Sequence, residues 1–274
     1  MKLFMISNMA DIAEYAFKCG VHRIMVDTET MGKSQRQAMV DAVFNSHEID
    51  DVSKIKTQTD GEVICRINQL NNKSDLEIDR AVDAGADFLM VPMIEDELDV
   101  RTLVKLIRGR IRFIPLLETC SSLVRLKNIV EIDEIDELYF GLNDLSIQMK
   151  LKFLHEISAS GLMRYCADVI AEKVPFGFGG IAKIGEGQVP AEYILSEHYL
   201  CKSSRVILGR AFHNNSTSLD ELVANTSLQQ DVEKLLRHWE GYTPAQAEEE
   251  NVKLGLSITE FRSNCVLRNF KESA

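Results

Sequence analysis

The stretch RFIPLLETCSS, residues 112–122, carries the pattern that decides the fold. Its apolar run ends abruptly in an acid, Glu118. Continuous apolar runs of this length are typical of parallel strands that are covered on both faces. A carboxylate at the end of such a strand is costly to bury unless another group compensates its charge. The stretch therefore indicates both a buried parallel strand and a candidate functional position.

Seven further β-prone runs occur along the chain, with amphipathic helical patterns between them. They span residues 3–7, 23–29, 62–68, 88–93, 137–142, 175–181 and 205–212. Eight strand–helix units fit a (β/α)₈ TIM barrel, which needs about 250 residues. An open doubly wound sheet is the alternative, but its first strand usually leads into a glycine-rich turn. Here that turn is SNMADI, without glycine.

The chain is predicted to be one barrel domain with an appendage. Residues 1–240 form the α/β barrel, and residues 241–274 form an extra C-terminal helix. Thr243 followed by Pro244 is typical of a helix N-terminus. We expect this extension to pack on a neighbouring subunit.

Composition excludes several classes of partner. The net charge of −11 argues against a nucleic-acid surface and against binding to an anionic membrane. The six cysteines form no CxxC pair, which disfavours a zinc site and indicates a reducing compartment. The N-terminal apolar run, LFMI, is too short for a signal peptide, and no apolar run approaches the ~20 residues of a membrane span. We expect a cytoplasmic protein.

Polar residues gather at the predicted C-terminal ends of the strands, where barrels build their active sites. They are Asp27, Glu29, Arg66, Asn68, Glu118, Asn143, Asp144 and Arg210. Two carboxylates from neighbouring strands, Glu118 and Asp144, suit Mg²⁺, which takes one or two protein carboxylates and completes its shell with water and substrate. Arg66 offers a planar fork to a substrate carboxylate. A metal and an arginine that face one 2-oxo acid can stabilise an enolate.

A structural interpretation of the same residues is equally compatible with composition and spacing. Asp144 could cap a helix that starts at Leu145, and Glu118 could lie in a first helical turn. Arg66 could be a structural ion-pair partner of a nearby acid. The shared position of these residues, at one end of consecutive strands, favours the functional interpretation.

A glycine-rich segment, PFGFGGIAKIGEGQVPAEY, follows the seventh strand and includes Gly179 and Gly180. Barrels often bind phosphate on the loops after strands seven and eight. With Lys183 and Arg210, this segment could hold a distal phosphate or carboxylate of the substrate. The alternative is that the glycines only allow tight backbone turns near the mouth, and we slightly favour that interpretation.

Five motifs give the chain a family resemblance. VDTET, ICRIN, GADFLMVPMIE, PLLET and GLNDLS, in this order and at these spacings, resemble the HpcH/HpaI aldolase and citrate lyase β-subunit family. The resemblance covers roughly residues 20–212, as expected for a whole barrel. The chain is also similar to a branch of that family found among bacterial surface-polysaccharide genes.

The resemblance implies roles for particular residues. Glu118 and Asp144 match the ligands of Mg²⁺ or Mn²⁺, and Arg66 matches the arginine that binds the substrate carboxylate. Asp27 and Glu29 match a D-x-E motif near the metal and its waters. In the last motif, Gly141 and Asn143 are expected to contact substrate. Family members commonly assemble as trimers or hexamers.

One departure concerns the proton carrier. The aldolases of this family have a histidine directly after D-x-E, where this chain has Thr30. Glu29, a metal-bound water or His213 could substitute. The other five histidines are expected on helices or loops away from the barrel mouth; they are His22, His47, His155, His198 and His238.

The leading prediction is a class II aldolase or carbon–carbon lyase that acts on a 2-oxo acid, sugar-like acids included. A Schiff-base mechanism is disfavoured because only Lys183 lies near a strand end. One alternative is a coenzyme A-thioester lyase of the citryl or malyl type. The other is a non-catalytic barrel that binds a metal and a carboxylate, for which Thr30 is the supporting feature.

Overall fold

Eight parallel strands form a closed barrel, in which each strand pairs with its neighbours in the sequence and β8 pairs with β1. The computed structural model describes residues 1–32 and 47–272, with side chains to residue 263. The strands are β1 (Lys2–Ile6), β2 (Arg23–Asp27), β3 (Glu62–Arg66), β4 (Phe88–Val91), β5 (Arg112–Leu117), β6 (Leu138–Phe140), β7 (Phe176–Ile181) and β8 (Arg205–Leu208). Each predicted run contains a strand, so the predicted (β/α)₈ barrel is confirmed.

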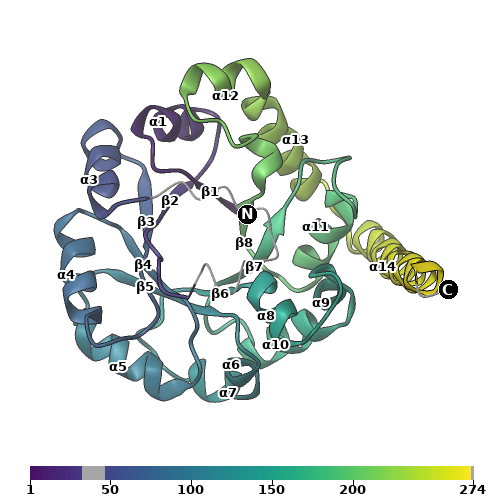
Figure 1. Ribbon diagram of the computed structural model, residues 1–274, viewed down its shortest axis with the longest axis horizontal. Coiled ribbons are helices and arrows are strands. Elements are labelled where there is room, and N and C mark those ends of the chain that lie inside the picture. Colours follow the sequence, from purple (N-terminus) through teal and green to yellow (C-terminus); the bar gives the residue numbers. More distant parts are fainter. Residues whose placement is uncertain (33–46, 273–274) are drawn as a thin grey trace.

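Helices surround the ring of strands, as Figure 1 shows in a view along the barrel. Those between β1 and β6 are α1 (Ala10–Lys18), α3 (Ile49–Gln58), α4 (Ser74–Asp83), α5 (Glu97–Ile107), α6 (Cys120–Val124) and α7 (Leu126–Ile129). Those after β6 are α8 (Leu142–Gln148), α9 (His155–Ala159), α10 (Leu162–Ile170), α11 (Ala191–Leu200), η1 (Arg210–Phe212), α12 (Leu219–Asn225), α13 (Leu228–Glu240) and α14 (Pro244–Glu272). In α5, Asp96 caps the N-terminus and Val100, Leu103 and Ile107 form the buried face. The 3–4-residue spacing of these apolar residues is what places them on one side of the helix.

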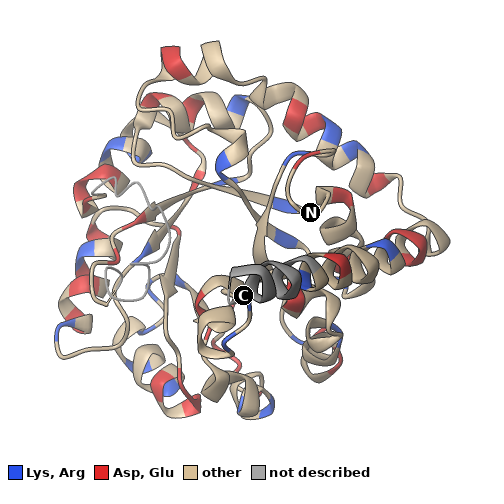
Figure 2. Ribbon diagram, turned by 45° about the vertical axis from the view of Figure 1, so that its right-hand side comes forward, with Lys and Arg blue, Asp and Glu red and all other residues tan. Residues whose placement is uncertain are grey.

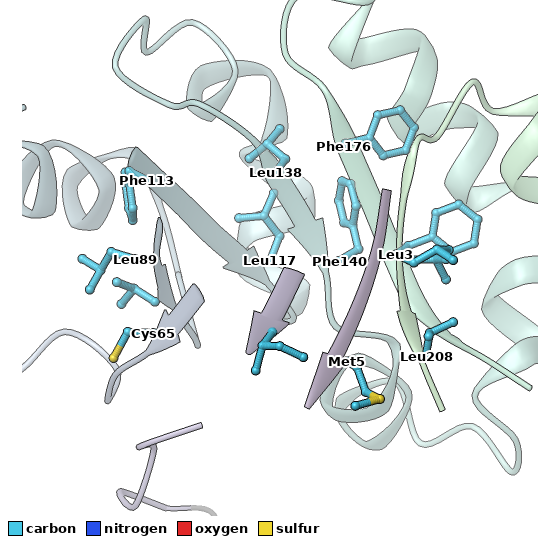
Figure 3. Packing of buried hydrophobic residues seen from close by; sticks show 14 of the residues in the cluster. Leu3, Met5, Cys65, Leu89, Phe113, Leu117, Leu138, Phe140, Phe176 and Leu208 are labelled. Atoms are coloured by element: carbon cyan, nitrogen blue, oxygen red, sulfur yellow. The ribbon is translucent and has the colours of Figure 1, made fainter. Parts of the chain in front are cut away.

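The apolar core has two layers because successive side chains in a strand point to opposite faces. The inner layer fills the barrel; it consists of Phe4, Met25, Ile64, Phe88, Met90, Ile114, Leu116 and Tyr139. The outer layer lies between the strands and the helices, and Figure 3 shows part of it, from Leu3 and Met5 of β1 to Leu117 of β5. Strands covered on both faces explain why the sequence shows continuous apolar runs rather than alternation.

Ion pairs close the N-terminal end of the barrel. Nη1 and Nη2 of Arg23 donate to the two carboxylate oxygens of Glu137, at 2.8 and 3.0 Å, and Nη2 of Arg205 donates to Glu137 at 2.9 Å. Burial raises the pKa of Glu137, but the bonds from Arg205 and Arg23 hold it below its ordinary value. Nε of Arg23 also donates to Glu62 at 2.7 Å, so these ion pairs are accounted for by the fold itself.

The C-terminal extension forms one long helix, α14, which projects from the ring at the right of Figure 1. Leu254 and Ile258 are buried with Val189 and Ile194 of the same chain. Contact with a neighbouring subunit stays a prediction. Figure 2 shows that acidic and basic residues are both spread over the outer helices. Within the described residues, no helix is both long enough and apolar enough to cross a membrane.

His198 is buried beside the barrel wall, and His155 is half-buried in α9. The ring of His198 in α11 lies flat on Phe178, with ring centroids 3.7 Å apart, and its Nδ1 is 2.9 Å from the hydroxyl of Ser203. Burial lowers the pKa of His198 to about 3 and that of His155 to about 4. Both rings are therefore neutral at pH 7.

We expect the free energy of unfolding to fall as the pH drops from about 6.5 towards 4, since unfolded histidines take up protons that these buried rings exclude. Each ring contributes a slope of about 1.4 kcal/mol per pH unit in that range. His198→Phe should remove one such contribution. Urea denaturation at pH 7, 6, 5 and 4 measures the slope, and an unchanged slope in the variant would contradict the assignment.

Candidate functional site

The strand-end residues meet because they continue the inner face of the barrel. Asp27 lies two residues beyond Met25, and Arg66 lies two residues beyond Ile64, both of which fill the interior. Glu118 likewise follows Leu116 by two residues. Side chains two apart in a strand point to the same face. The predicted residues of β2, β3 and β5 therefore converge at the C-terminal mouth of the barrel.

Arg66 and Asp27 form a bidentate ion pair across β2 and β3. Nε of Arg66 donates to Oδ1 of Asp27 at 2.8 Å, and Nη2 donates to Oδ2 at 2.6 Å. Oε2 of Glu29 lies 3.6 Å from the same Nε. Burial alone lowers the pKa of Arg66, but the charges of Asp27, Glu29 and Glu118 raise it above its ordinary value, so the guanidinium stays charged. The pair uses Nε and Nη2 of the guanidinium.

Glu118 is a buried carboxyl group with an unusual pKa. It is only 4% exposed, and its Oε1 accepts a 3.2 Å hydrogen bond from the backbone N–H of Met93. Burial, and then the negative charge of Asp144, raise the pKa of Glu118 to about 8, against a smaller opposing effect of Arg66. Thr119, not Glu118, caps helix α6. Because α6 begins at Cys120, Glu118 precedes the helix, and the alternative that it lies in a first helical turn does not apply.

Asp144 reaches the same place from β6 through a sharp transition into helix α8. The helix starts at Leu142 with Gly141 as its N-cap residue, so Asp144 lies inside the first turn and is not the cap. The positive end of the helix dipole favours a carboxylate there. Asp144 is 8% exposed, and its charge acts on Glu118, which places the two carboxyl groups close together.

Gly141 makes this approach possible. A Cβ atom at residue 141 would lie 2.3 Å from Oε2 of Glu118 and 2.9 Å from its Cβ. These distances are well inside van der Waals contact, so no other residue fits without displacing Glu118. Gly141 thus gives Glu118 its space, and the predicted contact of Gly141 with substrate stays a prediction.

The donor set fits a hard divalent cation. Among residues 1–32 and 47–272, no group of three or more Asp, Glu, His or Cys side chains forms a complete protein cage. Mg²⁺ does not need one, because water and substrate oxygens usually complete its shell. Glu118 and Asp144 are two buried carboxyl groups, and the charge of Asp144 helps to raise the pKa of Glu118 to about 8. A divalent cation held by both would relieve that repulsion.

The end of β2 and the residues that follow it are hydrogen-bonded to Asn68 after β3 and to His47 before α3. Oδ1 of Asn68 accepts hydrogen bonds from the backbone N–H groups of Thr30 and Met31, both at 2.8 Å. The backbone N–H of Asp27 donates to Nδ1 of His47 at 2.9 Å. Our expectation that His47 lies away from the mouth is therefore wrong. Twenty residues separate the two in the sequence, so their contact could not be read from local spacing.

The remaining predicted residues lie on the other side of the mouth. Gly179 and Gly180 are in β7, where the register with β8 shifts, and the hydroxyl of Tyr139 donates to the carbonyl of Gly179 at 2.6 Å. Lys183 forms a 2.9 Å ion pair with Asp231 of α13. Arg210 begins η1 and is exposed, as is Asn143 in α8. Lys183 is therefore paired outside the group of Asp27, Arg66 and Glu118.

Reasoning from sequence missed the contributions of Met93, Asn68 and His47 to this geometry. Met93 acts through its backbone N–H and has a positive φ of 58°, which is uncommon outside glycine. A backbone donor leaves no trace in side-chain patterns. The sequence places Asn68 at the end of β3, but its role as an acceptor depends on the position of Thr30 and Met31 in another loop.

Comparison with known proteins gives a consistent family. A family model described as HpcH/HpaI aldolase/citrate lyase matches residues 1–159. This range contains the candidate site residues Asp27, Glu29, Arg66, Glu118 and Asp144. No curated protein matches the chain. Solved structures with a similar fold include an HpcH/HpaI aldolase from Desulfitobacterium hafniense, with 14% identity, 76% of this chain and 85% of that chain covered, and a TM-score of 0.58.

Two further structures show the same fold. An HpcH/HpaI aldolase/citrate lyase family protein from Burkholderia cenocepacia is 16% identical, with 76% of this chain and 86% of that chain covered and a TM-score of 0.56. The citrate synthase SbnG is 15% identical, with 76% and 84% covered and a TM-score of 0.56. At these identities the likeness shows the barrel fold and not a shared substrate.

Proposed function

Because this chain belongs to the HpcH/HpaI aldolase/citrate lyase family, we propose that it is a class II, divalent-metal-dependent aldolase or carbon–carbon lyase. Its substrate would be a 2-oxo acid, and the reaction would pass through a pyruvate-type enolate. The observation that carries the proposal is the pair of buried carboxyl groups, Glu118 and Asp144, beside the charged Arg66. Such an arrangement costs stability in a barrel that binds nothing.

The residues of the chain divide the work. A bound Mg²⁺ or Mn²⁺ would supply a Lewis acid for the 2-oxo group, with Glu118 and Asp144 as its protein ligands. Arg66 would bind the substrate carboxylate through Nη1, while the two bonds to Asp27 hold the guanidinium in one orientation. Glu29, buried and 3.6 Å from Nε of Arg66, would move the proton at the methyl carbon of pyruvate.

The test is deuterium exchange into the methyl group of pyruvate, followed by NMR with Mg²⁺ or Mn²⁺, with EDTA, and in Asp144→Ala. Exchange that needs the metal and is lost in the variant supports the proposal. Exchange that persists in EDTA or in Asp144→Ala would contradict metal dependence. A complete lack of exchange would contradict pyruvate-type chemistry, and turnover of citryl- or malyl-coenzyme A would then identify the thioester-lyase alternative.

A Schiff-base route has less support in the geometry. The ammonium of Lys183 is paired with Asp231 at 2.9 Å, and the Lys183 side chain is only 15% exposed. Borohydride trapping with pyruvate should leave the protein unmodified, because a paired, charged amine is a poor nucleophile.

Gly141→Ala should reduce the exchange rate by about a hundredfold, because a displacement of Glu118 by the new methyl group misplaces a reacting component. The matched control is Gly255→Ala in α14, where a Cβ meets nothing within 4 Å. The control should react like the parent protein. NMR measurement of the exchange rates tests this difference, and equal rates for the two variants would exclude the steric role of Gly141.

A distal anionic group of the substrate, such as a phosphate or sugar-acid carboxylate, would lie near Gly179, Gly180 and the exposed Arg210. Lys183 would contribute only by leaving Asp231. Arg210→Ala should then raise the KM of a phosphorylated or sugar-acid substrate about tenfold while the KM of pyruvate stays unchanged. An unchanged KM in Arg210→Ala and Lys183→Ala would remove both residues from the substrate site.

The proposal includes a homo-oligomer, a trimer or hexamer, in which α14 packs on a neighbouring subunit. Val252 and Leu256 on α14 are 64% and 65% exposed and provide an apolar surface for that contact. Light scattering measures the mass in solution, and a monomer at micromolar concentration would contradict this part.

A further inference from the structure

The segment from Asp27 to Met31 is held from two sides by side chains outside it. On the β3 side, Oδ1 of Asn68 accepts from the N–H groups of Thr30 and Met31, each at 2.8 Å. The Thr30 hydroxyl is also directed at this oxygen, at 3.3 Å. Asn68 is itself fixed, because its backbone N–H and its side-chain amide both donate to Glu77 of α4, at 3.0 and 3.1 Å.

On the other side, His47 completes the hydrogen bonding of β2. Within the sheet, the carbonyl of Met25 accepts from the N–H of Ser7 on the β1 side at 3.2 Å. Asp27, two residues further on, presents its N–H to that same side, beyond the end of β1 at Ile6. Nδ1 of His47 accepts this N–H at 2.9 Å. The imidazole thus takes the place of the strand that has ended.

The direction of this hydrogen bond determines the tautomer of the ring. A backbone N–H can only donate, so Nδ1 of His47 must be the acceptor, and the proton of the neutral ring is on Nε2. His47 cannot accept a proton at Nδ1 without losing its bond to Asp27. The geometry therefore makes His47 a positioning residue and not the base that replaces the missing histidine at residue 30.

We propose that His47 and Asn68 form a two-sided clamp that sets the orientation of Asp27 and, through its bidentate bonds, of Arg66. Thr30 belongs to the clamped segment, and its hydroxyl and amide both point at Asn68, so residue 30 does not carry the proton in this chain. The kinetic consequence rests on the proposed function, in which Arg66 binds the substrate carboxylate. The hydrogen-bond geometry does not depend on it.

Two substitutions of His47 separate the role of Nδ1 from that of the ring as a whole. His47→Asn keeps an acceptor near the position of Nδ1, whereas His47→Gln places its amide near the position of Nε2. We expect His47→Gln to raise the KM for pyruvate by about tenfold or more, because the misplaced group is the carboxylate-binding arginine. His47→Asn should stay within about threefold of the parent protein.

The split between KM and kcat distinguishes positioning from a general loss of folding. A poorly folded variant contains less active protein, which lowers the apparent kcat and leaves KM unchanged. Equal behaviour of the Asn and Gln variants, whether both are active or both are impaired, would overturn the role of Nδ1. Circular dichroism melting of both proteins checks that their folded fractions are equal.

The tautomer can be measured without any substrate. In protein labelled with ¹⁵N-histidine, long-range ¹H–¹⁵N correlation should show the His47 proton on Nε2 and an acceptor-type shift for Nδ1. The Asp27 amide should exchange slowly with solvent, and faster in His47→Gln. A proton on Nδ1 would overturn the clamp. If the parent protein exchanges no pyruvate protons, the proposed function fails, while this measurement still decides the clamp.

The Asn68 half has its own matched pair. Asn68→Ala removes the acceptor shared by Thr30 and Met31 and should raise the KM for pyruvate as His47→Gln does. Asn128→Ala, at an exposed asparagine of α7 that contacts Glu97, is the control and should leave KM unchanged. An Asn68→Ala variant with the KM of the control would overturn this half.

Discussion

Glu118→Gln should abolish methyl-proton exchange while making the metal-free protein more stable. Loss of a metal ligand removes several kcal/mol of transition-state stabilisation, which corresponds to about a thousandfold in rate or more. The gain in stability has a separate cause. Burial and the charge of Asp144 raise the pKa of Glu118 to about 8 from an ordinary 4.5. Removing this destabilising buried carboxyl group should therefore raise the free energy of unfolding while it abolishes the reaction.

The pH dependence gives this prediction its sign. Between pH 4.5 and 8, the unfolded chain releases the Glu118 proton and the folded protein retains it. The contribution of Glu118 to the free energy of unfolding therefore falls as the pH rises through that range. Glutamine is neutral throughout, so the advantage of the variant should grow with pH and reach a few kcal/mol near pH 8.

Urea denaturation in EDTA at pH 5, 7 and 8.5 measures this difference, and Mn²⁺ titration calorimetry measures the loss of metal binding. The control is Glu131→Gln, which alters an exposed glutamate paired with Lys173. It should leave the exchange rate and the metal affinity as they are. If Glu118→Gln were less stable than the parent protein at every pH, the prediction would be wrong, because other groups of the fold would then stabilise the charge of the buried carboxylate.

Arg66→Ala should have the opposite effect on stability. It removes the guanidinium that donates to both oxygens of Asp27 and lies 3.6 Å from Glu29. Breaking a buried ion pair from one side typically costs about 3–5 kcal/mol, because the desolvated charge remains. The variant should also lose pyruvate binding. Arg66→Lys should recover part of the stability but not the KM, since an ammonium that pairs with Asp27 has no second nitrogen to offer the substrate carboxylate.

A double-mutant cycle with Asp27→Ala isolates this coupling. The double variant should be destabilised by less than the sum of the two single variants, because neither leaves a charge behind when both are removed. Arg237→Ala is the control; its ion pair with Glu233 spans one turn of α13 and is mostly exposed. Additive effects of Arg66→Ala and Asp27→Ala would show that the ion pair does not hold this region together.

Much of the site follows from the chain's local periodicity. In β2, β3 and β5, the acidic and basic residues at the strand ends follow interior residues by two positions, so the alternation of side chains already places them inside the barrel mouth. The apolar runs determined the parallel strands, and the closure of eight strand–helix units determined that their ends meet. The convergence of Asp27, Arg66 and Glu118 was therefore predictable without a structure.

The partners of each group were not predictable in this way. Lys183 is as close to a strand end as a catalytic lysine would be, yet it pairs with Asp231 of α13. His47 carries no signal of function in a loop, yet it accepts the backbone N–H of Asp27. The raised pKa of Glu118 depends on how closely Gly141 lets β6 approach. Covalent spacing determined which face and which end of the barrel each side chain occupies. Hydrogen bonds and pKa values instead depend on ångström distances between elements that are remote in the chain, and only packing of the whole barrel decides those distances.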